Sequence, residues 1–255
     1  MSTLETSLTC PLSRVGFGSF HIGRIAGDKY ASFGRPVPSV DESNEILNGV
    51  LDLGITLIDT APSYGLSELR IGKQIKHRRS SFNLCSKVGE LWEEGNSTFD
   101  FSRTGMKLSI ENSLINLQTD YIDILLIHAP DDDLRIIQET DAIDVIQNAK
   151  QEGKVKAIGF SGKTLQAQLE ALEWSDVMMV EYNVANQVNE PVIKKANETG
   201  KLVLIKKALN SGHLPSEEAI KFLSQTSQLR EMIDCVVIGS TSVNRMKENI
   251  ELFNA

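Results

Sequence analysis

Short apolar runs alternate with longer amphipathic stretches along this chain from about residue 14 onward. Strand-sized and helix-sized segments in strict alternation are typical of βα units, which assemble into a parallel sheet. The pattern therefore predicts an α/β protein built from repeated βα units. The predicted strands cover residues 15–20, 56–59, 82–87, 122–128, 155–161, 177–182, 202–206 and 235–238.

The segments between these strands carry start and stop signals for helices. Ser39 precedes an amphipathic stretch as a helix cap would, and Pro191 suits the first turn of a later helix. Gly54, Gly153 and Gly200 each follow a helical pattern and stand just before a strand. Glycine takes the left-handed conformation of a helix C-terminus at low cost, so helices are predicted to end there.

The number and order of the units favour a closed (β/α)8 barrel, the TIM barrel, over a doubly wound sheet. The chain contains no linker rich in Pro, Gly or Ser, and its 255 residues suit one barrel. The turn after the first strand, residues 16–21, reads GFGSFH and lacks the third glycine of a dinucleotide-binding turn. We therefore expect residues 1–255 to form a single barrel domain.

Charge and composition narrow the range of partners. A net charge of -8 provides no basic field for nucleic acid or anionic lipid, so neither is expected as a partner. The apolar stretches are shorter than the roughly 20 residues of a membrane span, and no signal-peptide pattern opens the chain. The three cysteines form no CxxC pair. We expect a cytoplasmic protein.

Four chemically active residues stand at or just beyond the ends of predicted strands: Asp59, Tyr64, Lys87 and His128. Catalytic side chains of a barrel come from the carboxyl ends of its strands, which gather on one face. The strands that carry Asp59, Lys87 and His128 are predicted neighbours about 4.8 Å apart. We therefore expect the four side chains to surround one point.

This combination of residue types suits acid-catalysed hydride delivery to a carbonyl. Tyrosine has an ordinary pKa of about 10 and is a weak acid, but a nearby ammonium stabilises the phenolate, which would be the task of Lys87. A lysine buried alone would lose its proton, so Asp59 would hold Lys87 charged and oriented. His128 can hydrogen-bond the substrate carbonyl or relay a proton. Tyr64 is then the expected general acid.

The segments around these residues resemble the aldo-keto reductase family, and the resemblance runs from Val15 to Ile250. It is carried by residues 57–65 (LIDTAPSYG), 82–87 (FNLCSK) and 124–128 (ILLIH). A short member of bacterial type is indicated. The resemblance implies a monomeric barrel that reduces an aldehyde or ketone to an alcohol, or runs the reverse oxidation, with an NAD(P)H cofactor.

The same resemblance implies a cofactor site at the C-terminus, for NADPH rather than NADH. A loop that leads from the last strand into a helix is a phosphate-binding position in barrels. Ser240 and Arg245 match the family residues for the adenosine 2′-phosphate, whereas Gly239 stands where relatives have lysine. The other residues that the resemblance assigns to this end of the cofactor are Thr241, Glu248 and Asn249.

Elsewhere the cofactor site departs from the family pattern. The positions that contact the nicotinamide in relatives read Ser161, Met179 and Lys206, of which only the serine agrees. Ser19 is also expected at the nicotinamide. Residues matching the stretch over the diphosphate are Lys207, Leu209 and Ser211. Walls of the substrate pocket are expected from Phe20 and from Trp92, in the loop after the third strand.

Two other classes of function remain as alternatives. The altered nicotinamide positions leave open a reductase-like, NADPH-binding regulatory module with little turnover. A metal-dependent barrel hydrolase would need histidine pairs at strand ends, but His21, His77, His128 and His213 are scattered. No metal site is therefore expected.

Overall fold

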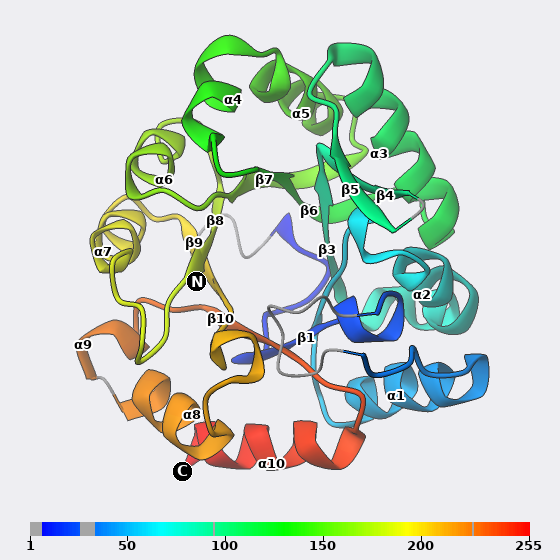
Figure 1. The fold of residues 1–255 in the computed structure, drawn as a ribbon, viewed down its shortest axis with the longest axis vertical. Coiled ribbons are helices and arrows are strands. Elements are labelled where there is room, and N and C mark those ends of the chain that lie inside the picture. The colour runs from blue at the N-terminus through cyan, green and yellow to red at the C-terminus, as the bar shows by residue number, and fades with distance from the viewer. Residues whose placement is uncertain (1–6, 26–33, 94, 226) are drawn as a thin grey trace.

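The computed structural model describes residues 7–25, 34–93, 95–225 and 227–255. Its main sheet is a closed barrel of eight parallel strands, which confirms the predicted fold (Figure 1). Every predicted strand is present, with shifts of at most two residues at its ends. The barrel strands are β1 (Val15–Gly18), β2 (Leu57–Asp59), β3 (Asn83–Val88), β6 (Ile122–His128), β7 (Val155–Ser161), β8 (Val177–Glu181), β9 (Leu202–Lys206) and β10 (Cys235–Gly239).

The first strand closes the barrel. Phe17 of β1 is in register with Ile58 of β2 on one side and with Ile238 of β10 on the other. The remaining strands follow chain order around the sheet, from β2 through β3, β6, β7, β8 and β9 to β10. Because all strands run in parallel, their carboxyl ends meet at one face of the barrel.

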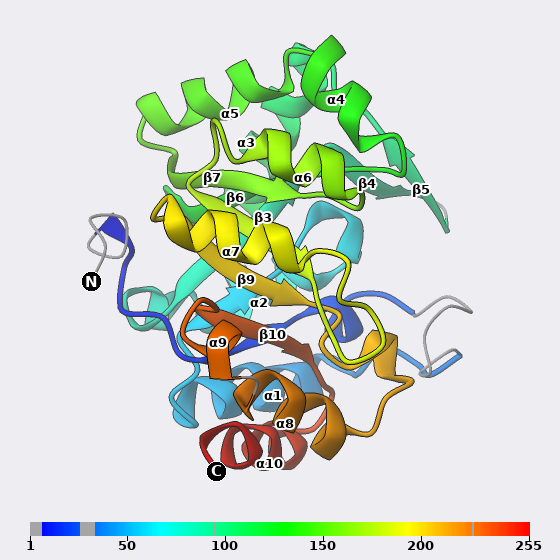
Figure 2. The same ribbon diagram turned by 90° about the vertical axis from the view of Figure 1, so that its left-hand side faces the viewer.

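Helices surround the barrel and return the chain to the start of each next strand (Figures 1 and 2). Two additional short helices, α4 and α9, extend the connections after β6 and β9. None of the helices in the described ranges is long and apolar enough to traverse a bilayer. The helices are α1 (Val40–Asp52), α2 (Ser67–Ile75), α3 (Arg103–Leu117), α4 (Asp133–Glu139), α5 (Ala142–Gln151), α6 (Leu165–Ala171), α7 (Glu190–Glu198), α8 (Ser216–Gln225), α9 (Ser227–Arg230) and α10 (Val243–Asn254).

The predicted helix signals are present in the structure. Ser39 forms a capping box with Glu42: its Oγ accepts from the Glu42 N–H at 3.2 Å, and its own N–H donates to the Glu42 carboxylate at 2.7 Å. Pro191 lies in the first turn of α7. Gly54, Gly153 and Gly200 have φ values of 83°, 76° and 69°, as expected where a helix ends in the left-handed conformation.

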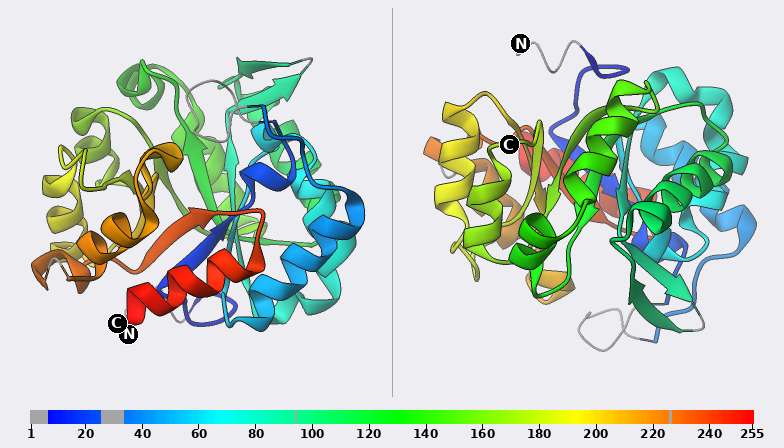
Figure 3. Two further views of the ribbon diagram at one scale, coloured as in Figure 1. Left: turned by 60° about the horizontal axis from the view of Figure 1, so that its bottom comes forward. Right: turned by 90° about the horizontal axis from the view of Figure 1, so that it is seen from above.

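The barrel interior is closed at its amino-terminal end. Leu8 packs against inward-facing side chains that include Leu57, Leu126 and Leu204. Thr9 is tied to the same end because its hydroxyl donates to Asp123 Oδ1 at 2.6 Å. Figure 3 shows this first segment at one end of the barrel, and α10 between α1 and α8 on its outside. Among the described residues, this packing closes the amino-terminal end, and the cavity lies at the carboxyl ends of the strands.

The connection after β3 contains an antiparallel hairpin that the sequence pattern did not predict. Its strands are β4 (Glu90–Glu93) and β5 (Asn96–Phe99), with Trp92 opposite Ser97. Figure 2 shows the hairpin projecting from the barrel. All of β5 is exposed. None of the residues of β4 and β5 is fully buried, so the hairpin lacks the alternation of buried apolar and exposed polar residues that marks a strand, and the prediction of a loop here was wrong.

Candidate active site

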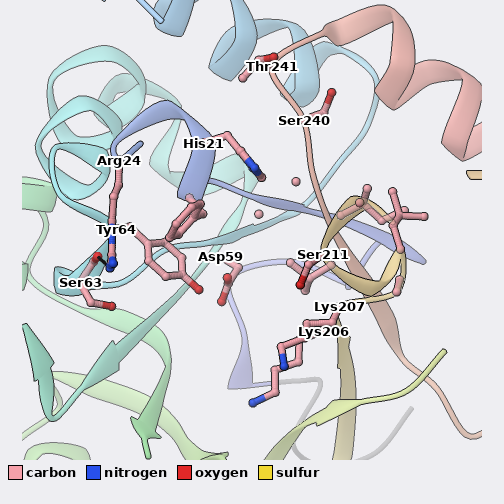
Figure 4. Close-up of a pocket in the computed structure, with 18 of the residues that line it drawn as sticks. His21, Arg24, Asp59, Ser63, Tyr64, Lys206, Lys207, Ser211, Ser240 and Thr241 are labelled. Atoms are coloured by element: carbon pink, nitrogen blue, oxygen red, sulfur yellow. Dashed lines mark hydrogen bonds between the residues drawn. The ribbon is translucent and has the colours of Figure 1, made fainter. Parts of the chain in front are cut away.

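A cavity of about 1360 Å³ opens at the carboxyl ends of the barrel strands (Figure 4). Its size exceeds the ~300–1,000 Å³ of an ordinary small-ligand pocket and suits a dinucleotide together with a substrate. Except for Ser19 and Trp92, all the site residues predicted from the sequence lie on its wall. These are Phe20, Asp59, Tyr64, Lys87, His128, Ser161, Met179, Lys206, Lys207, Leu209, Ser211, Gly239, Ser240, Thr241, Arg245, Glu248 and Asn249.

A buried ion pair forms the base of the β2–β3 side of the cavity. Lys87 Nζ lies 2.6 Å from Asp59 Oδ1, and the two side chains are only 2% and 6% exposed. The ammonium also donates to the Thr60 carbonyl at 2.9 Å. Burial is the largest single influence and lowers the pKa of Lys87, but the Asp59 carboxylate together with Tyr64 and Cys85 outweighs burial and raises that pKa well above its ordinary value. Lys87 is therefore held as a cation.

The Tyr64 ring lies against this cation. Lys87 Nζ is 4.6 Å from the ring centroid, a cation–π distance. Phe20 packs edge-to-face on the same ring, with 5.2 Å between centroids, and the His128 ring centroid is 6.3 Å away. Tyr64, Lys87, Asp59 and His128 therefore converge as the sequence predicted.

A tight contact between two loops fixes the backbone at Tyr64. Tyr64 ends a 3-10 turn, Pro62–Tyr64, and Gly65 follows with a φ of 62°. A Cβ on Gly65 would lie 2.5 Å from the Gly23 carbonyl oxygen, and one on Gly23 would lie 2.1 Å from the Tyr64 carbonyl oxygen. The Leu66 N–H donates to the Gly23 carbonyl at 3.0 Å. Both glycines are needed for this close approach.

His128 has a carboxylate partner that sequence reasoning missed. Its Nδ1 lies 2.8 Å from Glu90 Oε2 on the hairpin, and the two side chains are 20% and 15% exposed. The Ser63 hydroxyl lies 3.4 Å from the same nitrogen. Burial raises the pKa of Glu90, but hydrogen bonds from His128, Ser97 and Ser63, together with attraction to the protonated form of His128, outweigh burial and lower that pKa to about 2. For His128, burial is the largest influence and lowers its pKa.

The β7–β9 side of the cavity is organised differently. Lys206 Nζ donates to Ser161 Oγ at 2.9 Å and to the Gly162 carbonyl at 2.8 Å. Within the described residues, no carboxylate lies within ion-pair distance of this nitrogen. Burial and then the charge of neighbouring Lys207 lower the pKa of Lys206 to about 7. Met179 of β8 is nearly fully buried and also lines the cavity.

The loop after β10 has the features of an anion site. Ser242 caps α10, since its Oγ accepts from the Arg245 N–H at 3.4 Å, and the Ser240 hydroxyl accepts from the Ser242 N–H at 3.1 Å. Exposed Arg245 lines the cavity at this helix N-terminus. A Cβ on Gly239 would lie 3.1 Å from His21 Nδ1, so glycine at this position leaves the space between these two residues of the cavity wall unfilled. Helix dipole and guanidinium together suit a phosphate.

Strained backbone surrounds the same side of the cavity. Lys207, Asn210 and Ser211 have φ values of 53°, 45° and 57° although none is glycine. Such conformations cost free energy and cluster at ligand sites. The Lys207 ammonium forms an ion pair with Glu181. This segment is therefore held in an unfavourable conformation at the position where the resemblance places the cofactor diphosphate.

The structure corrects two of the predicted placements. Ser19 is fully buried away from the cavity: its hydroxyl donates to the Asp59 carbonyl at 2.7 Å and accepts from Ser67 Oγ at 2.6 Å. Trp92 does not line the cavity, because its ring is covered by the Arg24 guanidinium at 3.1 Å from the centroid. Ser19 therefore positions the backbone at Asp59, and Trp92 packs on the rim.

Arg24 is a second residue that sequence reasoning missed. It lines the cavity, lies 5.5 Å from the Phe20 ring centroid, and donates to the Ser63 carbonyl at 2.9 Å. It thus joins the hairpin to the turn that carries Tyr64. No sequence signal identified it, because arginine at a strand-to-helix connection is common on protein surfaces.

Within the described ranges, no cluster of three or more His, Cys, Asp or Glu side chains could hold a metal ion.

The fold and the site together define a (β/α)8 barrel protein whose cavity carries a tyrosine beside a buried Lys–Asp pair and an arginine at the N-terminus of the last helix. Residues 14–227 match the model of the aldo/keto reductase family, and the chain belongs to this family. Members of this family are oxidoreductases that act on carbonyl groups with a nicotinamide cofactor.

Individual relatives agree with this assignment. The chain is 32% identical over 227 residues, 86% of its length, to the aldo-keto reductase YhdN of Bacillus subtilis. It is 27% identical over 223 residues, 80% of its length, to an NADH-specific methylglyoxal reductase of Escherichia coli. It spans only 65% of each of these relatives. A Pseudomonas aeruginosa structure described as an aldo-keto reductase superposes with a TM-score of 0.85 at 35% identity, covering 95% of this chain and 90% of the other.

Proposed function

We propose that this protein reduces an aldehyde or ketone with NADPH, or oxidises the corresponding alcohol, and that Tyr64 is the general acid. The observation that carries the proposal is the position of the Tyr64 ring 4.6 Å from Lys87 Nζ, over the buried Lys87–Asp59 ion pair. A cation held in that place stabilises negative charge on a phenol oxygen. The phenol can then release its proton to a substrate oxygen.

Each residue of the group has a separate task in this proposal. A bound reduced nicotinamide would supply the hydride. Tyr64 donates a proton to the carbonyl oxygen, and Lys87 offsets the negative charge left on the phenol. Asp59 keeps Lys87 charged and in place, since a lone buried ammonium would lose its proton. His128 orients the reacting oxygen.

The part of the cavity wall formed by the loop after β10 and the start of α10 fits a dinucleotide with an added phosphate. Arg245 and the N-terminus of α10 provide positive charge at the cavity wall in a protein whose net charge is -8. The arginine supports NADPH over NADH, because only NADPH carries the 2′-phosphate. The Escherichia coli relative is NADH-specific by name, so the choice needs a direct comparison of the two cofactors in this protein.

The remaining expectations accompany this function. We propose that residues 1–255 act as one barrel domain, as a monomer in the cytoplasm, on a small-molecule carbonyl or alcohol. Phe20 supports a wall for such a substrate, because it packs edge-to-face on Tyr64 at the cavity. The negative net charge supports small molecules over nucleic acid or a membrane surface as partners.

The test is Tyr64→Phe, which removes one hydroxyl. We expect kcat for carbonyl reduction to fall by about 100-fold or more, the usual scale for loss of a general acid, while NADPH binding measured by fluorescence quenching is nearly unchanged. Tyr121→Phe is the matched control, since its hydroxyl contacts Thr9 at the other end of the barrel. Retained turnover in Tyr64→Phe contradicts the proposal. Binding of NADPH by the wild type without turnover across a broad carbonyl panel would favour a regulatory module.

A further inference from the structure

The two nitrogens of His128 face different surroundings. Nδ1 is engaged by the Glu90 carboxylate at 2.8 Å, with the Ser63 hydroxyl at 3.4 Å. His128 lines the cavity next to Tyr64, so Nε2 is the nitrogen that remains for a ligand there. Which of the two carries the proton decides whether His128 offers a donor or an acceptor to that ligand.

The surroundings place the proton on Nδ1. An ionised carboxylate only accepts hydrogen bonds, so the nitrogen next to Glu90 must be the donor. Hydrogen bonds from His128, Ser97 and Ser63 help to hold the pKa of Glu90 below its ordinary value, so the carboxylate is ionised at neutral pH. Burial is the largest influence on the pKa of His128 and lowers it, as do the charges of Lys87 from β3 and Lys206 from β9. Glu90 from β4 raises this pKa, but the net change is a lowering. The neutral ring then carries a single proton.

We propose that Glu90 is a positioning residue that fixes His128 as the Nδ1–H tautomer, so that Nε2 is presented to the cavity as a hydrogen-bond acceptor. The ligand group that this arrangement selects is a hydroxyl. The site in its resting form therefore binds the alcohol of an alcohol–carbonyl pair in preference to the carbonyl. This choice of ligand rests on the proposed function, whereas the tautomer does not.

The preference for an alcohol follows from hydrogen-bond chemistry. An alcohol can donate its O–H to an unprotonated Nε2, whereas a carbonyl oxygen has only lone pairs to present to it. A polar atom that loses water without gaining a partner is penalised. A carbonyl can satisfy Nε2 only after His128 takes up a proton. Binding of the carbonyl is therefore coupled to proton uptake, and binding of the alcohol is not.

The tautomer is measured by ¹⁵N NMR of the histidine side chains in the whole protein without cofactor, for the wild type, Glu90→Gln and Glu93→Gln. Glu93 lies on the same hairpin strand but is exposed, so it serves as the matched control. We expect a protonated Nδ1 and an unprotonated Nε2 in the wild type and in Glu93→Gln. Glu90→Gln should lose this preference, because an amide can donate as well as accept. A proton on Nε2 in the wild type, or an unchanged tautomer in Glu90→Gln, overturns the inference.

The ligand preference is measured by titrating benzyl alcohol and benzaldehyde separately and following the His128 ring signals. At neutral pH we expect benzyl alcohol to bind the wild type several-fold more tightly than benzaldehyde does. The ratio of the two Kd values should become smaller in Glu90→Gln, and also in the wild type at lower pH. Equal or tighter binding of benzaldehyde to the wild type overturns the preference. A protein that shows the expected tautomer but lacks Tyr64-dependent turnover refutes the proposed function alone, and an Nε2–H tautomer in an active enzyme refutes this inference alone.

Discussion

Two lysines reach the same cavity from different sides of the barrel, and their pKa values move in opposite directions. Burial opposes the charge of both. Lys87 has the Asp59 carboxylate at 2.6 Å, which together with Tyr64 and Cys85 outweighs burial and raises the pKa of Lys87. Lys206 is bonded instead to the neutral Ser161 hydroxyl and the Gly162 carbonyl, next to a second cation, Lys207, and its pKa is lowered to about 7.

The difference separates two ways of building a site. On the β2–β3 side, Lys87, Asp59, His128 and Glu90 satisfy one another, so this region is organised before any ligand arrives. On the other side, Lys206 has only neutral hydrogen-bond acceptors, Arg245 stands exposed at a helix N-terminus, and the backbone of the 207–211 loop is strained. That region is suited to an anionic ligand that supplies the missing charge.

Breaking the Lys87–Asp59 ion pair should have the largest effect on stability and activity. Lys87→Met leaves the Asp59 carboxylate buried without its cation, and loss of one partner of such a pair costs about 3–5 kcal/mol. We expect urea unfolding to show a destabilisation of that size, and carbonyl reduction to fall by about 100-fold or more.

The double variant Asp59→Asn/Lys87→Met tests the cause of the destabilisation. If an uncompensated carboxylate is responsible, removing its charge as well should restore much of the lost stability without restoring turnover. A double variant that is less stable than Lys87→Met would show that the pair contributes through packing rather than through charge.

A second buried carboxyl group, that of Glu68, lies next to β3 and makes the stability of the fold depend on pH. Glu68 is 2% exposed and accepts hydrogen bonds from Ser86 at 2.7 Å and Ser113 at 3.2 Å, and burial raises its pKa from 4.5 to about 7. An unfolded chain loses this proton near pH 4.5 and the folded one near pH 7. The protonated group therefore favours folding below pH 4.5, and this advantage is lost as the pH rises to 7.

Glu68→Gln should remove that pH dependence. Relative to the variant, the wild type should lose up to about 3 kcal/mol of unfolding free energy between pH 4.5 and 7, since one pKa unit corresponds to ~1.4 kcal/mol. Urea unfolding at several pH values measures the difference, and Glu173→Gln on an exposed turn is the control. Parallel stability curves for the wild type and Glu68→Gln would refute the assignment.

Removing the positive charge of Arg245, at the N-terminus of α10, should affect ligand binding rather than folding. Arg245→Ala is expected to raise the Kd for NADPH about tenfold, equivalent to ~1.4 kcal/mol, with little change for NADH. Lys247→Ala is the control, because it lies on the same helix, pairs with Glu251 and does not line the cavity. An equal loss of affinity for both cofactors would contradict a 2′-phosphate contact.

The smallest effect is a difference in reactivity between the two lysines. An amine reacts with an acylating reagent in its neutral form, so at pH 7.5 Lys206 should be acetylated faster than other lysines, and bound NADPH should slow this reaction. Lys87 should stay unmodified in the folded protein. Peptide mass spectrometry over time measures both rates. Modification of Lys87 before Lys206 would reverse the comparison.

The sequence predicted the barrel well because its evidence is local. Each strand is a short apolar run, and each cap is a single residue type such as Ser39 or Gly54, so the alternation alone defines the units. The positions of Asp59, Lys87 and His128 then follow, since parallel strands bring their carboxyl ends together. The prediction was less successful where a side chain at a strand end could face either the cavity or the neighbouring backbone. Ser19 is an example, because its hydroxyl donates to the Asp59 carbonyl instead of facing the cavity.

The sequence by itself therefore determined the eight-stranded barrel and the chemical types at its carboxyl end. The tertiary structure alone decided the partners of those groups: Glu90 for His128, Arg24 for Trp92, and no carboxylate for Lys206 within the described residues. Hydrogen bonds and pKa shifts depend on distances between segments remote in the chain, and a hairpin without a buried apolar face has no periodic pattern to reveal it.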